Sequence, residues 1–211
     1  MNAILISIQP QWVEKILNGE KTIEIRKTIP KCKLPCKVYI YCTKAKNRFD
    51  TCVIHNKNKE RNDYSFCEIG NGKVVAEFTL NQADEFSVFE NGSVQYWNCY
   101  NLEKSCLTYE QIAKYIGYDK KYGYKNGYAW FIDNLKIYDK PKELSEFQSA
   151  LFNMSICVKS EKNNKSFCRY CCKHYNGDFD DCGLGFHRFK QLTRPPQSWC
   201  YVNDLEENYE L

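Results

Sequence analysis

Hydrophobic and polar positions change period twice within the first 26 residues. Residues 3–8 form an apolar run rich in β-branched side chains, which predicts a strand with at least one buried face. Proline is favoured at a first helical position and glycine just beyond a last one, so Pro10 and Gly19 bracket a helix of about two turns. Beyond this helix apolar and polar residues alternate. The alternation predicts a second strand with Glu24 and Arg26 on the same face.

The clearest helix in the rest of the chain spans residues 107–117. Thr108 and Gln111 have the spacing of a capping box, and Gly117 follows the last apolar position. Further runs predict strands at residues 38–43, 74–80 and 128–138.

Two polar regions interrupt these elements. Residues 44–63 are dense in Lys, Arg and Asn and predict a long exposed excursion, whereas residues 82–101 predict an irregular stretch with an Asn-Gly turn. Trp130 is expected in the core, because large aromatic side chains are usually mostly buried.

Composition indicates a folded globular protein. Hydrophobic residues make up 43% and charged residues 27% of the 211 residues, which favours a folded globular protein over a disordered one. Aromatic residues reach 15% and include 16 tyrosines. Most tyrosines are expected in cores and loops, and a surface subset would provide stacking platforms for bases.

Positive charge is concentrated at the N-terminal end. Residues 1–48 contain ten Lys or Arg against three Glu, whereas the remaining 20 basic and 23 acidic residues sum to −3. This asymmetry favours an anionic partner such as nucleic acid or phosphate, with a solvated lysine-rich face as the alternative.

Two further features concern the cellular compartment. The first apolar run is too short for a signal sequence or a membrane span, so we expect a cytoplasmic protein with no membrane partner. Thirteen cysteines in such a protein are expected to be reduced thiols, buried small residues or metal ligands.

The second predicted strand also carries a recognisable motif. Gly19, Lys21, Glu24 and Arg26 reproduce the G-x-K-x-x-E-x-R signature of ASCH domains, placed after a strand and a short helix. The chain therefore resembles an ASCH domain protein of the PUA-like superfamily. The resemblance covers residues 1 to about 147, and the ending PPQSWCYV is similar to the tail of longer ASCH proteins of phages and prophages.

This resemblance implies an α+β fold, a PUA-like small mixed β-barrel with flanking helices. It also implies binding of RNA or a nucleotide-like anionic ligand in a cleft that the signature residues line. Lys21 and Arg26 would supply positive charge, and Glu24 would orient Arg26 or contact a base edge. Ser7 and Gln9, at the end of the first strand, complete the expected ligand-binding set. The alternative is a strand-face ion pair of little energetic value.

An enzymatic alternative also follows from the family. Small bacterial ASCH amidohydrolases deacetylate N4-acetylcytidine with a Lys, a Thr and a Glu. Lys21 matches the lysine, but Glu24 stands at the threonine position, and Glu110 is the candidate acid. A ribonuclease is a further alternative, with Glu24 as base and Lys21 or Arg26 stabilising charge. The catalytic residues of a hydrolase would then be Lys21, Glu24 and Arg26.

Residues 150–190 differ in composition from the rest of the chain. They contain many Cys and His but few aliphatic residues. A segment that cannot build a hydrophobic core needs another constraint, such as a bound metal ion, to become ordered. A C-x2-C pair followed by a second, atypical set predicts a structural zinc ion, with free thiols as the alternative. The candidate ligands are Cys168, Cys171, Cys172, His174 and Cys182.

The predicted organisation is therefore an ASCH domain at residues 1–147 and a cysteine-rich, zinc-stapled elaboration at residues 148–211, whose tail packs back on the barrel. A third functional class is a phage accessory protein that binds and modulates a host protein through its tail and its insertions.

Overall fold

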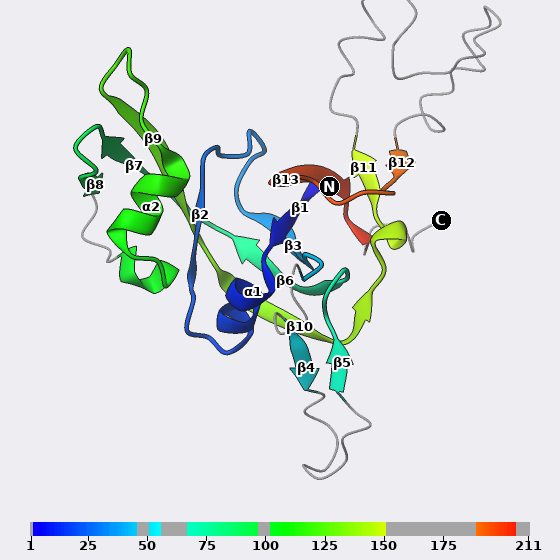
Figure 1. The fold of residues 1–211 in the computed structure, drawn as a ribbon. Helices are drawn as coiled ribbons and strands as arrows, with labels where there is room; N and C mark the ends of the chain where they lie inside the picture. The colour runs from blue at the N-terminus through cyan, green and yellow to red at the C-terminus, as the bar shows by residue number, and fades with distance from the viewer. Residues whose placement is uncertain (1, 46–50, 56–66, 97–101, 151–188, 206–211) are drawn as a thin grey trace, which may run out of the picture.

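The computed structural model describes residues 2–45, 51–55, 67–96, 102–150 and 189–205, and they form two main sheets with two α-helices (Figure 1). One sheet has seven strands in the spatial order β10 (Asp133–Lys142), β6 (Val74–Leu80), β3 (Cys36–Cys42), β1 (Asn2–Ile8), β13 (Trp199–Asn203), β11 (Gln148–Ala150) and β12 (Phe189–Gln191). It is mixed, because β1 pairs with β3 in parallel and with β13 in antiparallel orientation.

The second main sheet is antiparallel. Its four strands are, in spatial order, β2 (Ile23–Arg26), β9 (Tyr124–Phe131), β7 (Ala83–Phe89) and β8 (Val94–Tyr96). A separate antiparallel pair consists of β4 (Val53–His55) and β5 (Cys67–Ile69). The helices are α1 (Pro10–Leu17) and α2 (Tyr109–Ile116), with short 3-10 turns η2 (Leu102–Ser105) and η3 (Leu144–Glu146). The predicted α+β class with flanking helices is confirmed.

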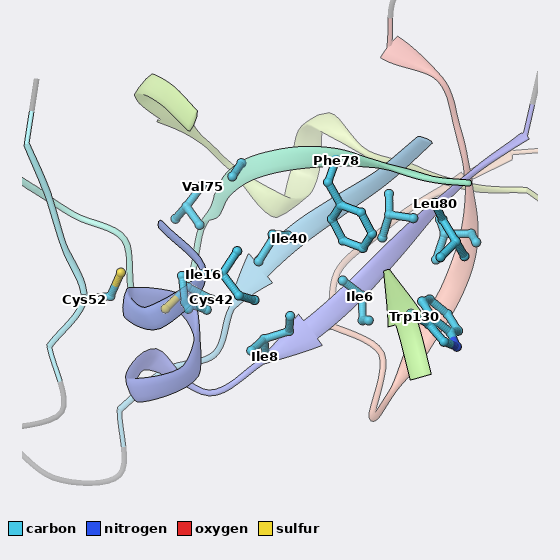
Figure 2. Close-up of a cluster of buried hydrophobic side chains, with 14 of the residues drawn as sticks. Ile6, Ile8, Ile16, Ile40, Cys42, Cys52, Val75, Phe78, Leu80 and Trp130 are labelled. Atoms are coloured by element: carbon cyan, nitrogen blue, oxygen red, sulfur yellow. The ribbon is translucent and has the colours of Figure 1, made fainter. Parts of the chain in front are cut away.

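Strand β1 is central to the seven-stranded sheet and is buried on both faces. Ile4, Ile6 and Ile8 point into the cluster shown in Figure 2, which includes Trp130 and the buried side of α1. Leu5 packs into a second cluster on the opposite face. An uninterrupted apolar run is what a strand covered on both faces requires.

Both predicted helices form, and each ends where its capping residues place it. Pro10 is the first residue of α1, and the chain leaves this helix through Gly19. Thr108 caps α2 through the predicted box with Gln111, and Gly117 follows the last helical residue.

The region 82–101 was predicted to be an irregular stretch with an Asn-Gly turn. The turn forms, but within the described residues 82–96 the prediction of irregular structure is wrong. This region contains β7 and β8, joined by a turn that includes Gly92 in the left-handed region at φ +79°. Phe86 and Val88 alternate into the core between β7 and α2. The pattern has a period of two, and the polar residues between the apolar ones occupy the other face.

The predicted strand 128–138 is two strands. β9 ends at Phe131 and β10 begins at Asp133, so the chain passes from the four-stranded to the seven-stranded sheet at Ile132. Trp130 lies in the core, as predicted, with no exposed surface. The prediction of a long exposed excursion over residues 44–63 is also wrong in part, because Cys52 and Ile54 are buried.

The strands after residue 147 belong to the same sheet as β1. β13 lies between β1 and β11, with Asn2 opposite Asn203, and β11 pairs with β12. The predicted domain boundary at residue 147 therefore falls within the seven-stranded sheet. None of the helices in the described ranges has the length and apolar character of a membrane span.

Candidate functional site

The turn between α1 and β2 positions the signature residues. Gly19 adopts φ +78° without any atom near the place of a side chain, so the position demands glycine for its backbone conformation rather than for space. The Lys21 N–H then donates to the carbonyl of Lys15 at 3.0 Å, which folds the chain back over the end of α1. Lys21 thereby approaches the strand face of Glu24 from the turn.

Lys21, Glu24 and Arg26 form a buried charged triad. Lys21 Nζ lies 3.1 Å from Glu24 Oε2, and Arg26 Nη2 lies 3.0 Å from Glu24 Oε1. The three side chains are 2%, 9% and 7% exposed. Two cations and one carboxylate give the triad a net charge of +1. Removed from water, such charges interact far more strongly than surface pairs do.

The Lys21 ammonium has a full set of acceptors. Besides Glu24, it donates to the carbonyl oxygens of Ile23 at 2.8 Å and Ser105 at 2.7 Å. An ammonium has three donors, and all three are used. The Trp12 ring centroid lies 5.8 Å from Nζ and covers the group further. Lys21 thus holds β2 against the turn η2 and fixes one oxygen of Glu24.

Arg26 joins the triad to two distant segments. Its Nη2 donates to the carbonyl of Ser7 at 2.8 Å, and its Nη1 donates to Ser198 Oγ at 3.3 Å. The Ser7 hydroxyl donates to the carbonyl of Pro196 at 2.7 Å, so the tail before β13 is tied to β1 beside the guanidinium. Arg26 Nε is buried and has no hydrogen-bond partner among the described residues.

A second buried donor lies on the same face of the four-stranded sheet. Trp130 is directly opposite Glu24 in the pairing of β2 with β9, and residues opposite one another share a face. Its Nε1 also lacks a partner within the described ranges. Trp199 packs on the Trp130 ring at 5.9 Å between centroids. Buried donors usually have partners, and these two N–H groups are the unsatisfied donors of this face among the described residues.

Two cysteines of the neighbouring strands, Cys36 and Cys200, have raised pKa values. Cys200, one residue after Trp199, has its pKa raised to about 11 by burial. Burial and a hydrogen bond with Cys32 raise the pKa of Cys36 to about 12. A thiol reacts as its thiolate, and the raised pKa values disfavour that form of both residues at neutral pH. Cys32, Cys36, Cys42, Cys52, Cys106 and Cys200 are free thiols.

The expected ligand-binding residues lie in two environments. Ser7 is buried and contacts Arg26 through its carbonyl, whereas Gln9 is exposed at the N-cap position of α1, where its side chain makes no capping hydrogen bond. Glu110, the candidate acid of the enzymatic alternative, is exposed in the first turn of α2. The five candidate zinc ligands between residues 168 and 182 lie outside the described residues. Among the residues that the structure describes, no group of three potential metal ligands is found.

Sequence reasoning named Ser7 as a ligand-binding residue but did not predict that Ser7, Ser105 and Ser198 are the partners that complete the triad. Ser105, Ser7 and Ser198 are 84, 19 and 172 residues from the charged groups that they bind. The first two contribute backbone carbonyls, which any residue type can supply. Ser198 lies within the PPQSWCYV ending, and the likeness of that ending to the tails of longer ASCH proteins was the available signal.

Comparisons with known proteins give the following result. No family model and no curated protein matches the chain. Among solved structures, the chain is similar to an ASCH protein from Zymomonas mobilis, with 15% identity, 98% of this chain and 91% of that chain covered, and a TM-score of 0.48. Two crystal structures of single-residue mutants of that protein give 16% and 14% identity, the same 98% of this chain, 94% and 92% of theirs, and TM-scores of 0.48 and 0.46.

Proposed function

We propose that the chain binds RNA or a nucleotide-like anion at the buried triad, in the manner that its ASCH signature implies. The observation that carries the proposal is the Arg26 guanidinium, which is buried within a triad of net charge +1 and keeps Nε without a partner among the described residues. A phosphate oxygen or a base carbonyl would satisfy that donor and offset the charge. The positive N-terminal region supports the same partner class.

The two cations of the triad have different roles in this proposal. Lys21 has no donor left for a ligand, so its role is to hold Glu24. Glu24 in turn orients Arg26, and Arg26 is the group that contacts the ligand. This assignment favours a binder over a hydrolase, because a general base must reach the proton that it takes, and both Glu24 oxygens already contact cations.

Binding is tested by fluorescence anisotropy with a labelled single-stranded RNA at several salt concentrations. We expect affinity to fall steeply with salt through counterion release. The ¹⁵Nε–H resonance of Arg26, identified by its loss in Arg26→Lys, should shift when RNA or a mononucleotide is added. Absence of binding at low salt, or an unchanged Nε resonance at saturation, would refute the proposal.

The enzymatic alternative is tested in the same samples. RNA and N4-acetylcytidine are incubated with the wild-type protein and with Glu24→Gln, and products are separated by chromatography. We expect no turnover in either. Hydrolysis by the wild type that disappears in Glu24→Gln, in a sample that circular dichroism shows to be folded, would refute the assignment as a binder and implicate Glu24 in the chemistry.

A further inference from the structure

A second surface of the molecule combines exposed rings with positive charge. Residues 118–126 are called the tyrosine loop here. They comprise most of the connection from α2 to β9 and the first three residues of β9, and the connection projects beyond the four-stranded sheet (Figure 1). Tyr118, Tyr122 and Tyr124 are 41%, 62% and 44% exposed. They line an open pocket of about 500 Å³ together with Asp119, Lys120, Lys125 and Asn126.

The tyrosine loop is held in one conformation by its own backbone. The Asp119 carbonyl accepts from the N–H groups of Tyr122 at 3.2 Å and Gly123 at 2.8 Å, and its carboxylate accepts from the N–H of Lys121 at 2.8 Å. Gly123 adopts φ +73°, which glycine allows without strain. A loop that is already ordered loses less entropy on binding.

The charges of this loop suit a polyanion. It contains Lys120, Lys121 and Lys125 against the single carboxylate of Asp119, which is engaged with the loop backbone. The Lys121 ammonium lies 4.9 Å from the Tyr122 ring centroid, so a charge and a stacking surface occupy the same place. Two acidic residues adjoin the loop: the Glu85 carboxylate accepts a hydrogen bond from the Asn126 side-chain amide, and the Glu90 N–H donates to the Gly123 carbonyl.

One face of β9 connects the tyrosine loop to the triad. Every second residue of β9 lies on this face, namely Tyr124, Asn126, Tyr128 and Trp130. Tyr128 is directly opposite Arg26. The exposure of these residues decreases from Tyr124, through the two half-buried residues, to Trp130. Six residues of strand span roughly 20 Å, so a mononucleotide at the triad would not reach the loop. Glu85, opposite Tyr128, is the carboxylate on this path.

We propose that the tyrosine loop is a second contact surface for single-stranded RNA, which stacks its bases on Tyr118 and Tyr122 and places its phosphates beside the three lysines. This inference rests on the proposed function, because it extends the path of the same ligand away from the triad. Exposed aromatic rings interleaved with lysines bind single strands without sequence preference, since every base has a π face.

The experiment compares variants of the full chain with two probes, a labelled uridine oligomer of about 12 nucleotides and uridine monophosphate. The double variant Tyr118→Ala, Tyr122→Ala should weaken oligomer binding by about 25-fold or more and leave the affinity for the monophosphate unchanged. Replacing the three lysines with Gln should lower the slope of log affinity against log salt by about 2. Tyr109→Ala removes a tyrosine that is 52% exposed and lies outside the pocket, so it should bind as the wild type does.

The outcomes separate the two proposals. Oligomer binding that survives the double tyrosine change but is lost in Arg26→Lys overturns the inference and leaves the proposed function standing. Loss in the double tyrosine variant with full binding by Arg26→Lys supports the loop and removes the triad as the site. A wild-type protein that binds neither probe overturns both. Thermal melting of each variant checks that it is folded, and exposed positions such as Tyr122 should change stability little.

Discussion

Replacing Glu24 with Gln is the most informative single change in this protein. The carboxylate contacts both cations at 3.0–3.1 Å, and its side chain is 9% exposed, so water screens these contacts weakly. The amide keeps the shape but removes the negative charge, which raises the net charge of the triad from +1 to +2. Breaking a buried pair by removing one partner costs about 3–5 kcal/mol, a large share of the usual total stability.

The assay is urea unfolding at neutral pH, because urea, unlike guanidinium, does not screen charges. Glu24→Gln should lower the free energy of unfolding by about 3–5 kcal/mol with an unchanged m-value. The matched control is Glu20→Gln, since Glu20 pairs with Lys15 at 2.9 Å on the surface with 53% and 39% exposure. The control should leave the unfolding midpoint unchanged.

A double-mutant cycle identifies the cause of the loss. Lys21→Met removes one cation, and the combined variant removes both members of one contact. We expect a coupling free energy of about 1–3 kcal/mol between the two positions. Additive effects, or a loss below about 1 kcal/mol in Glu24→Gln alone, would show that the triad charges do not interact as the geometry requires.

Three further predictions follow from other parts of the structure. Thr108→Ala removes the cap of α2, in which Thr108 Oγ1 accepts from the Gln111 N–H at 3.2 Å, and should lower the free energy of unfolding by about 1 kcal/mol, measured by urea titration. Gly127→Ala would place a Cβ 2.5 Å from Phe86 Cζ, and this overpacking should cost about 1–3 kcal/mol, seen as a lowered melting temperature. We also propose about one zinc ion per chain at the cysteine- and histidine-rich residues; less than about a tenth of an equivalent by elemental analysis after metal-replete expression, with this segment still protease-resistant, would refute it.

Local signals in the sequence predicted the elements that capping and periodicity define. Pro10, Gly19 and the Thr108 box gave both helices, and the β-branched runs gave β1, β3 and β6. The passage of the chain from one sheet to the other at Ile132 was not predictable. The alternation of apolar and polar residues continues across this position and does not show which strand each segment pairs with. The β7–β8 hairpin was predictable from its alternation and its Asn-Gly turn.

The charged residues of the site were predicted from the signature, but their environment was not. Alternation placed Glu24 and Arg26 on one face without showing whether that face lies in a cleft or in the interior. One of the three donors of the Lys21 ammonium is satisfied by the backbone carbonyl of Ser105. A backbone acceptor can come from any residue type, so no signal in the sequence pointed to it. Long-range packing therefore determined what the motif could do.

The position of β13 has a consequence for synthesis of the protein on the ribosome. β1 emerges long before β13, yet one of its two edges pairs with residues 199–203, and Arg26 donates a hydrogen bond to the hydroxyl of Ser198 just before that strand. Contacts between the two ends of a chain form slowly, because a long loop must close first. A nascent chain can build its helices and the parallel β1–β3 pair, but it acquires the complete site only when β13 has emerged.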